Sequence, residues 1–283
     1  MEAQMLMRQQ KMDLLQQMPE KSRTFFKWFF ALTEVYRPSG DLDGARQTII
    51  GWADKLGIDH KVDEAGNVLF SIPATPGKEN VPSIVLQGHL DIVAVGEFEE
   101  KGKVPLKIEG PNLTSGVSTI GADDGVSVAT MFTMMETRGE FEHGPLEFLV
   151  TMDEEIGLVG ASKLAGPPFI KSRTMLNLDT EEWGIIYTSC AGSLSINFEK
   201  DLKTDETYEG RPITVKLCDF VSGHTGICIH EGRVNAVKWM VRLLLEARRR
   251  GMEFRLCSIS GGDKHNAIPN TCNCELYVKS EGF

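Results

Sequence analysis

Apolar residues recur at helical spacing in the first sixty residues of the chain. A glutamine-rich stretch over residues 5–20 predicts a leading helix or a frayed arm. A second helix is expected over residues 22–36 and should end at the Arg-Pro-Ser-Gly sequence of residues 37–40. A third is expected over residues 43–57 and ends on a glycine. These helices carry no evident chemistry and are interpreted as packing elements.

The pattern then changes to apolar runs bounded by glycine and proline, as strands require. These runs cover residues 60–72, 83–89, 146–155 and 174–182. Between them, residues 125–139 place Val128, Phe132 and Met135 on one helical face, which indicates core packing. Continuous apolar strands that alternate with helices predict an α/β domain with a mostly parallel sheet and helices on both faces.

The pattern of predicted strands and helices changes again after residue 188. Residues 211–220 read as a strand, 233–250 as a helix, and 254–260 and 273–278 as two further strands. This βαββ unit predicts a separate small α+β domain. We therefore expect domains at residues 1–188 and 189–283.

Composition restricts the partners. Forty acidic residues against thirty basic ones give a formal charge of -10, which argues against nucleic acid. No apolar run is long enough for a membrane span, and the N-terminus lacks a signal peptide, so a cytoplasmic protein without a membrane partner is expected. Six cysteines without CxxC spacing are interpreted as reduced thiols: Cys190, Cys218, Cys228, Cys257, Cys272 and Cys274.

Polar clusters follow three of the predicted strands, and a fourth cluster opens a helix. They are His89 with Asp91, Asp153 with Glu154 and Glu155, Asp179 with Glu181 and Glu182, and Asp123 with Asp124. The carboxyl ends of parallel strands share one edge of a sheet, so the acids should converge. Converging carboxylates repel one another, and divalent cations remove that cost. Each motif alone is more often structural; the four together favour a metal site with zinc, or with Mn²⁺ or Co²⁺ as alternatives.

Six segments in order carry a resemblance to a known family: GHLDIV, TIGADDGVSVA, TMDEEIGLVGA, LNLDTEEWGIIYTSCAG, SGHTGICIHEGRVNA and GGDKHNAIP. They resemble the dinuclear-zinc exopeptidases of the peptidase D group, the aminoacyl-histidine (Xaa-His) dipeptidases, which are relatives of carnosinases and glutamate carboxypeptidases. The likeness runs from about residue 24 to residue 278. It implies a catalytic domain followed by a lid domain of the dimerisation type. A small peptide substrate is implied, and a homodimer is compatible with it.

The resemblance also implies the roles of individual residues. His89 and Asp179 would bind one zinc ion, Glu155 the other, and Asp123 both. The peptide from Asp123 to Asp124 would be cis.

The same resemblance assigns the residues that act on the substrate. Asp91 would orient the His89 ring, and Glu154 would be the general base for attack by metal-bound hydroxide. His224 would polarise the substrate carbonyl from the lid, and Asn266 would contact the substrate. Without the family, His224 is as readily an ordinary turn residue. The remaining histidines are interpreted as surface or core residues: His60, His143, His230 and His265.

The sequence departs from the family at its end. Family members add one more histidine ligand from a late segment that returns to the catalytic sheet, and this sequence stops at Phe283, within the lid. We therefore expect the chain as it stands to be inactive or impaired, with an incomplete catalytic domain and the first half of a lid. A truncated dipeptidase and a shortened non-catalytic binding homologue both remain open. So does an aminoacylase or carboxypeptidase acting on N-acyl amino acids.

Overall fold

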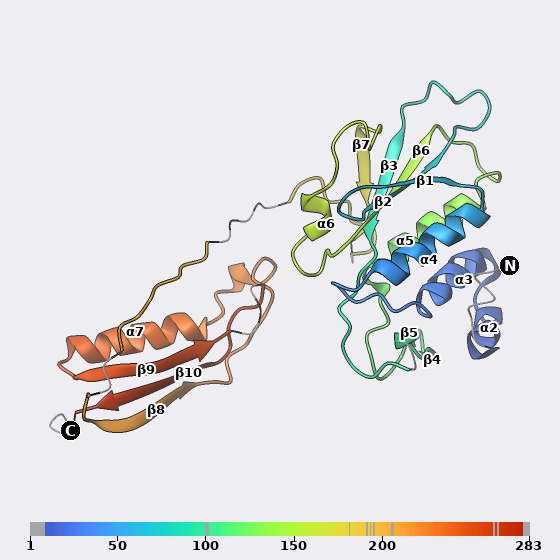
Figure 1. Ribbon diagram of the computed structural model, residues 1–283. Helices are drawn as coiled ribbons and strands as arrows, with labels where there is room; N and C mark the ends of the chain where they lie inside the picture. Colours follow the sequence, from blue (N-terminus) through green and yellow to red (C-terminus); the bar gives the residue numbers. More distant parts are fainter. Residues whose placement is uncertain are drawn as a thin grey trace. The chain divides into compact units, whose positions relative to one another are not determined.

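The computed structural model divides into two compact units, Met1–Ser189 and Cys190–Phe283, which are treated separately (Figure 1). It describes residues 9–99, 102–180, 182–190, 192, 194, 196–204, 207–262, 264 and 266–279. The expected leading helix over residues 5–20 is seen as α2 (Gln9–Gln16), and its first residues lie outside the described part of the chain.

Helices of the first unit form where the apolar spacing predicts them. Figure 1 shows α3 (Arg23–Leu32), α4 (Asp43–Lys55) and α5 (Ala122–Glu136) grouped beside the sheet. The α4 helix is followed by Gly57 at a φ of 67°, a left-handed conformation that favours glycine after a helix end. The described residues of this unit also form two short helices, η1 (Glu20–Ser22) and α6 (Val159–Ser162).

The main sheet has five strands in the order β1-β2-β6-β3-β7. They are β1 (Asp59–Val62), β2 (Val68–Ile72), β3 (Ile84–His89), β6 (Leu146–Thr151) and β7 (Thr174–Asn177). A small hairpin of β4 (Lys107–Glu109) and β5 (Asn112–Thr114) lies outside this sheet.

The α/β class is confirmed, and the sheet is mixed. The β6, β3 and β7 strands run parallel, whereas β1, β2 and β6 are antiparallel neighbours. Residues 60–72 therefore belong to a hairpin. Its turn is closed by Asp63, whose Oδ1 accepts hydrogen bonds from the N–H groups of Ala65 (3.0 Å) and Asn67 (2.9 Å). That local turn reverses the chain, so the hairpin adds its strands antiparallel to β6.

Alternate residues of the central strands pack on opposite faces of the sheet. In β2, Val68 and Phe70 belong to the large core beneath α3, α4 and α5, while Leu69 faces the other way. On that opposite face, Leu69 packs with Leu149 against Phe169, in the segment after α6. The sheet is thus covered on both faces, as the apolar runs predict. Its parallel strands end together at the edge where the acids lie.

The second unit is the expected βαββ arrangement. Strands β8 (Arg211–Leu217), β10 (Cys272–Val278) and β9 (Phe254–Gly261) form an antiparallel sheet in that order. The α7 helix (Ala236–Arg249) packs on it through Ala236 and Met240, and a 3-10 turn, η3 (Ile229–Glu231), precedes it. Strand β9 is an edge strand, and its outer backbone groups have no neighbour within this sheet.

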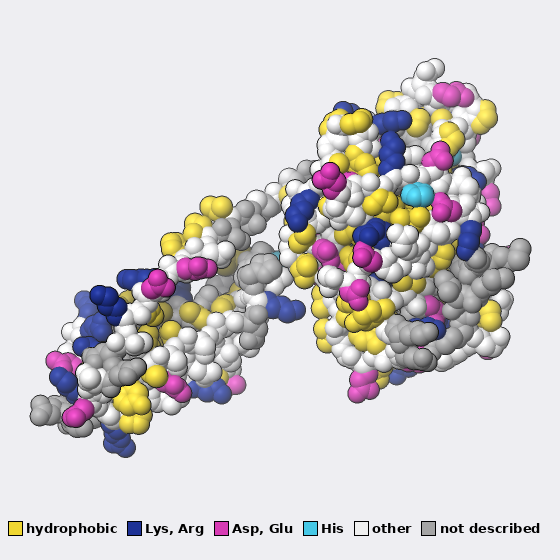
Figure 2. All heavy atoms as spheres, viewed as in Figure 1, with side chains coloured by type: hydrophobic (Ala, Val, Ile, Leu, Met, Phe, Trp, Pro, Cys, Tyr) yellow, Lys and Arg dark blue, Asp and Glu magenta, His cyan; other side chains and the backbone are white. Residues whose placement is uncertain are grey.

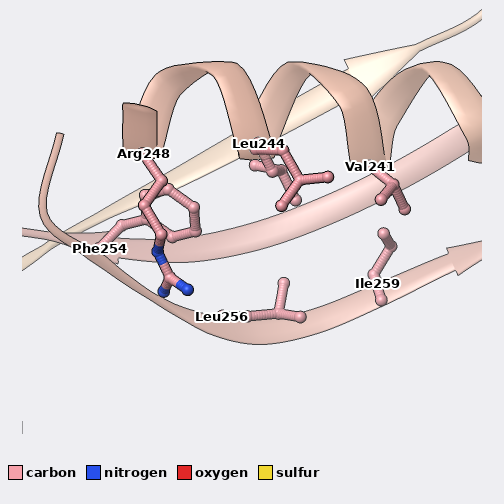
Figure 3. Close-up of a pocket in the computed structure, with 7 residues that line it drawn as sticks. Val241, Leu244, Arg248, Phe254, Leu256 and Ile259 are labelled. Atoms are coloured by element: carbon pink, nitrogen blue, oxygen red, sulfur yellow. The ribbon is translucent and has the colours of Figure 1, made fainter. Parts of the chain in front are cut away.

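An apolar groove runs between α7 and β9 (Figure 3). Val241, Leu244 and Leu245 line it from the helix, and Phe254, Leu256 and Ile259 line it from the strand, with Arg248 at one end. Leu245 is 57% exposed and Leu256 is 48% exposed, so this surface is apolar and open to solvent.

Surface properties agree with the composition. On the face of the first unit in Figure 2, basic side chains lie scattered among acidic ones and form no continuous basic patch. Among the described helices, none combines the length and the apolar character that crossing a membrane requires. All six cysteines are free thiols, and Cys272 and Cys274 are buried side by side in β10.

Candidate metal centre

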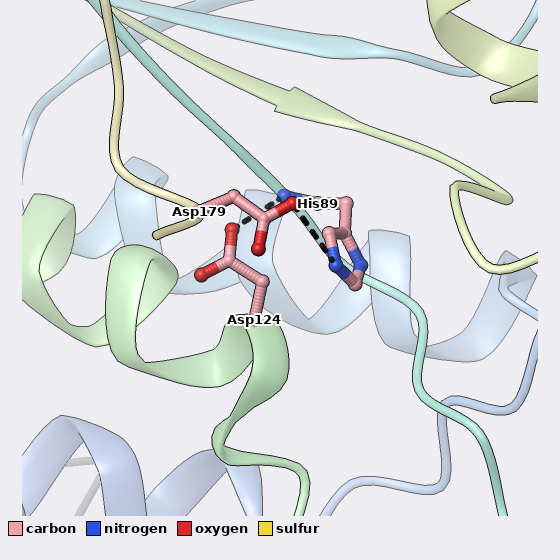
Figure 4. Close-up of side chains that lie close together, drawn as sticks. All are labelled: His89, Asp124 and Asp179. Atoms are coloured by element: carbon pink, nitrogen blue, oxygen red, sulfur yellow. Dashed lines mark hydrogen bonds and ion pairs between the residues drawn. The ribbon is translucent and has the colours of Figure 1, made fainter. Parts of the chain in front are cut away.

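His89 is the last residue of β3 and stands at the centre of the acidic cluster. Its side chain is 1% exposed, and its Nε2 lies 2.9 Å from Asp123 Oδ1. The same nitrogen lies 3.8 Å from Glu154 Oε2 and 3.8 Å from Asp179 Oδ2 (Figure 4 draws His89 with Asp179). One imidazole nitrogen therefore faces carboxylates from three separate loops.

The other ring nitrogen is held by Asp91. His89 Nδ1 lies 3.0 Å from the Asp91 carbonyl oxygen and 3.4 Å from Asp91 Oδ1. A carbonyl oxygen only accepts, so Nδ1 carries a hydrogen and Nε2 is the nitrogen left to bind a cation. The Asp91 carboxylate expected to orient the ring lies near Nδ1, and the Asp91 backbone carbonyl oxygen makes the shorter contact.

Asp91 also joins the ends of β3 and β6. Its two carboxylate oxygens accept hydrogen bonds from the N–H groups of Glu154 (2.9 Å) and Glu155 (3.1 Å), and from the Ser39 hydroxyl (2.8 Å). Burial alone would raise the pKa of Asp91, but the bonds from His89, Glu154 and Ser39 lower it to about 2. The carboxyl is therefore a permanent anion that orients both the ring and the two glutamates.

The two adjacent aspartates at the start of α5 play different parts. The peptide between Asp123 and Asp124 is cis, as the resemblance implies. Asp123 is exposed and points its Oδ1 at the His89 ring. Asp124 is buried, and its Oδ2 accepts the backbone N–H of His89 at 3.0 Å while its Oδ1 accepts from the Ser127 N–H at 3.3 Å and from the Ser127 hydroxyl. Asp124 thus ties the helix to the end of β3.

In the described part of the chain, two sets of three side chains have ligand atoms within 4.8 Å of one another. One set is His89, Asp123 and Glu155; the other is His89, Asp124 and Asp179 (Figure 4). The four residues expected to bind metal therefore lie together. Asp124 is an addition, and because its oxygens already accept backbone and hydroxyl hydrogen bonds, we interpret it as a support for the ligands.

Electrostatics of the cluster favour a cation. Burial, followed by the charge of Asp123, raises the pKa of Glu155 to about 7, and burial raises the pKa of Asp124 to about 6 and also raises that of Glu154. Burial would lower the pKa of His89, but hydrogen bonds to Asp123 and other nearby carboxylates outweigh it and raise the pKa to about 11. Burial, together with the neighbouring negative charges, thus makes protons bind these acids more readily than exposed carboxyl groups. Divalent cations would replace those protons, so the residues fit a metal centre.

A pocket opens beside these acids. Ile92, Val93 and Ile120 supply apolar lining, and Asp123 and Glu155 lie at its polar side. Apolar walls with a few converging polar groups are typical of small-ligand sites.

His224 and Asn266 lie in the second unit, on two backbone segments that pair with each other. His224 forms an antiparallel bridge with Ala267, and the Asn266 carbonyl oxygen accepts the N–H of Thr225 at 2.8 Å. His224 Nδ1 accepts the N–H of Gly226 at 3.1 Å, so in the neutral ring Nε2 carries the hydrogen and is a donor.

Three other described histidines belong to neither metal-ligand set. His60 pairs with Asp54 at 3.2 Å, His143 contacts the Gly144 carbonyl oxygen, and His230 is exposed; the two metal-ligand sets found in the described part of the chain include none of these. His265 and Glu181 lie outside the described residues.

Arg37 and Ser39 support the acid-bearing loops and are not marked by the sequence pattern. They belong to the Arg-Pro-Ser-Gly sequence, which by itself indicates only a helix end. Arg37 is 1% exposed, and Ser39 donates to Asp91. A charged residue directly after a strongly apolar helix is the one signal that could have drawn attention to this segment.

Comparison with known proteins agrees with this architecture. A sequence model described as peptidase family M28 matches residues 67–201, and one described as a peptidase dimerisation domain matches residues 215–283. The cytosol non-specific dipeptidase of Escherichia coli is 34% identical over 264 residues, covering 89% of this chain and 53% of the relative.

Solved structures give the same result. Aminoacylhistidine dipeptidase from Vibrio alginolyticus is 31% identical with a TM-score of 0.65, covering 93% of this chain and 55% of that protein. A tripeptidase from Staphylococcus aureus shares the fold at 17% identity, with a TM-score of 0.51, covering 91% of this chain and 66% of that one. The chain spans about half the length of the two dipeptidases that it matches.

The chain with this mixed sheet, the acids at its strand ends and the βαββ unit is similar to the peptidase class in both of its units. Within that class, the chain is a homologue of the cytosol non-specific and aminoacylhistidine dipeptidases, the group that its motifs resemble.

Proposed function

We propose that this protein acts in the metal-dependent hydrolysis of dipeptides such as Xaa-His. The observation that carries the proposal is the convergence of Asp123, Glu154 and Asp179 on the buried Nε2 of His89. His89, Asp123, Glu155 and Asp179 would hold two divalent cations, with zinc as the preferred ion and Mn²⁺ or Co²⁺ as alternatives. When bound, the cations would polarise the scissile carbonyl and acidify the attacking water.

The chain's own residues would supply binding and proton transfer. Glu154 is the proposed general base, because burial raises its pKa and its backbone N–H is held by Asp91, which leaves its carboxylate free to face the cluster. It would take the proton of the attacking water and pass it to the leaving nitrogen. The pocket beside Asp123 and Glu155 would take an apolar part of the substrate.

His224 and Asn266 are the proposed substrate contacts of the second unit. The Nε2–H of His224 is a hydrogen-bond donor and suits a carbonyl or carboxylate oxygen of the substrate. We propose residues 1–188 as the catalytic part and 189–283 as part of a lid domain. We also propose a cytoplasmic location, since the Escherichia coli relative is a cytosol dipeptidase by name.

Metal titration combined with hydrolysis assays tests the function. The chain should bind Zn²⁺ or Co²⁺, and hydrolysis of dipeptides is measured both on the chain and on a version extended by the late segment that carries the family's additional histidine. Glu154→Gln in the active form should lower the rate by about 10²- to 10⁴-fold and leave metal affinity unchanged. Glu140→Gln, at an exposed position after α5, is the control and should change neither quantity.

Three results would redirect the proposal. Hydrolysis of N-acyl amino acids in preference to dipeptides would point to the aminoacylase class. Metal binding without turnover in both forms would point to a binding protein. Absence of metal binding in the extended form refutes the proposal altogether.

Homodimer formation through the second unit is also proposed. The region matched by the peptidase dimerisation domain contains the open edge of β9 and the apolar groove beside it, and a second copy is the proposed occupant. Light scattering should show a dimer that Leu245→Glu converts to a monomer. Val81→Glu, at a 44% exposed apolar position of the first unit, should leave the dimer intact. A monomeric parent chain contradicts this part.

A further inference from the structure

Arg37 is a buried cation that joins two of the loops that carry the metal-binding residues. Its side chain is 1% exposed. Its Nη1 donates to the Leu90 carbonyl oxygen at 2.7 Å, and its Nη2 donates to the Gly121 carbonyl oxygen at 2.6 Å. Leu90 directly follows His89, and Gly121 lies two residues before Asp123. One guanidinium therefore spans the two backbone segments whose spacing sets the distance between these ligands.

The residues after Arg37 bind the same part of the molecule. Within segment 37–40, the Ser39 hydroxyl donates to Asp91 Oδ2 at 2.8 Å, and the Gly40 N–H donates to Asp153 Oδ1 at 2.7 Å. Asp153 immediately precedes the proposed general base. A short segment far away in sequence thus contacts three of the four acid-bearing loops, those of Asp91, Asp123 and Asp153.

The loop at the start of α5 is shaped around the guanidinium. A Cβ atom on Gly121 would lie 2.5 Å from Arg37 Nη2, and a Cβ atom on Gly125 would lie 2.6 Å from the same nitrogen. A side chain at either position would therefore require the guanidinium to shift. The glycines that flank the two aspartates are therefore matched to Arg37.

Charge explains why the buried position suits arginine. A buried cation is costly unless it is compensated, and the nearby charges of Asp124, Asp91 and Asp123 act on Arg37. Burial lowers its pKa to about 10, so it stays charged at neutral pH. A planar guanidinium can donate to two carbonyl groups in different directions, whereas a lysine ammonium at the end of a flexible chain cannot reproduce that geometry.

We propose that Arg37 is a positioning residue of the metal centre, which sets the spacing between the His89 loop and the Asp123 loop. The inference rests on the proposed function, because it concerns the affinity of the same centre for cations. Arg37 touches neither cation nor substrate in this role. It acts through the two backbone carbonyl groups that it holds.

Cobalt titration of Arg37→Lys tests the proposal. The variant keeps the charge and loses the two-carbonyl geometry, so Co²⁺ should bind about 10- to 100-fold more weakly, the range seen when residues supporting metal ligands are replaced. The visible absorption spectrum of bound Co²⁺ should change as well, since it reports ligand geometry, which a loss of stability alone does not alter. Circular dichroism confirms that the variant is folded.

Arg138→Lys is the matched control. Arg138 also joins two carbonyl oxygens, those of Met135 (2.7 Å) and Leu56 (2.9 Å), and neither belongs to the acid-bearing loops. Its replacement should leave Co²⁺ affinity and spectrum unchanged.

A second variant keeps the test decisive if Arg37→Lys does not fold. Gly125→Ala changes neither Arg37 nor any proposed ligand residue, but its Cβ would displace the guanidinium, so this variant should also bind Co²⁺ more weakly and with a changed spectrum. Parent-like affinity and spectrum in a folded Arg37→Lys, or in Gly125→Ala, overturn the inference. So does tighter binding in Arg37→Gln, which would show that Arg37 acts mainly by repelling cations. If the parent chain itself binds no Co²⁺, the proposed function fails first.

Discussion

Gly88 in β3 is predicted to be irreplaceable, because α5 leaves no space for a side chain there. A Cβ atom at this position would lie 2.4 Å from Asp124 Oδ2 and 2.6 Å from Ser127 Cβ. Gly88→Ala must therefore push the start of α5 away from the strand. That movement breaks the 3.0 Å hydrogen bond from the His89 N–H to Asp124 Oδ2.

The expected loss follows from two contributions. Forcing a methyl group into a packed site costs about 1–3 kcal/mol. Losing a hydrogen bond to a charged acceptor costs about 1.5–3 kcal/mol. The free energy of unfolding should fall by about 2.5–6 kcal/mol in total, which is a large part of the roughly 5–15 kcal/mol typical of a native protein.

Urea unfolding of the first unit measures this loss. Fluorescence of the buried Trp28 and Trp52 follows the unit, and the midpoint should fall without a change in slope. Gly51→Ala is the control: Gly51 is inside α4, a Cβ atom there meets nothing within 4 Å, and alanine should stabilise the helix by about 0.5–1 kcal/mol. A Gly88→Ala variant within about 0.5 kcal/mol of the parent chain refutes the packing argument.

Three further predictions follow from charge. The pKa of His89 is raised to about 11, so a cation must displace a proton from the metal-free protein, and cation affinity should rise with pH. Titration calorimetry at pH 7.5 in buffers of different ionisation enthalpy should show the release of about one proton, and binding heats that do not depend on the buffer would contradict this. Because the pKa of Asp91 is lowered from 3.8 to about 2, its stabilising effect is complete above pH 3.8 and is lost as the pH falls through 2. Asp91→Asn should therefore lower the free energy of unfolding by about 2 kcal/mol at pH 6 and leave it unchanged below pH 2, as denaturant curves at both pH values can check. Lys11 and Glu34 form a buried ion pair at 2.5 Å, so Lys11→Met should cost about 3 kcal/mol in urea unfolding, with Lys21→Met on the exposed surface as the neutral control.

The strands and helices were largely predictable because burial repeats at short range along the sequence. The apolar run ending at His89 became β3, and residues 125–139 became most of α5, with boundaries shifted by only a few residues. Strand direction was less accessible. Residues 60–72 join the sheet antiparallel because Asp63 closes a tight turn, and an aspartate in a glycine-containing loop does not by itself distinguish a hairpin from a connection.

The proposed ligands of the centre differ from their supports in how the sequence marks them. His89, Asp123 and Asp179 are polar residues at points where apolar strands end or helices begin, so the local pattern marks them and the sheet topology brings them together. No local sequence pattern marks Arg37, because its proposed role depends on carbonyl groups more than fifty residues away in sequence and on glycines that leave space for its side chain.

Asp124 illustrates the same limit at closer range. It is adjacent to Asp123 and chemically identical, yet burial and the Ser127 hydroxyl direct it toward the His89 backbone instead of the ring. Two carboxylates next to each other in sequence therefore differ in function through the direction in which the backbone turns them. Distinguishing a proposed ligand from its support thus requires the hydrogen bonds of each carboxylate, because a carboxylate whose two oxygens both already accept hydrogen bonds is poorly placed to bind a cation as well.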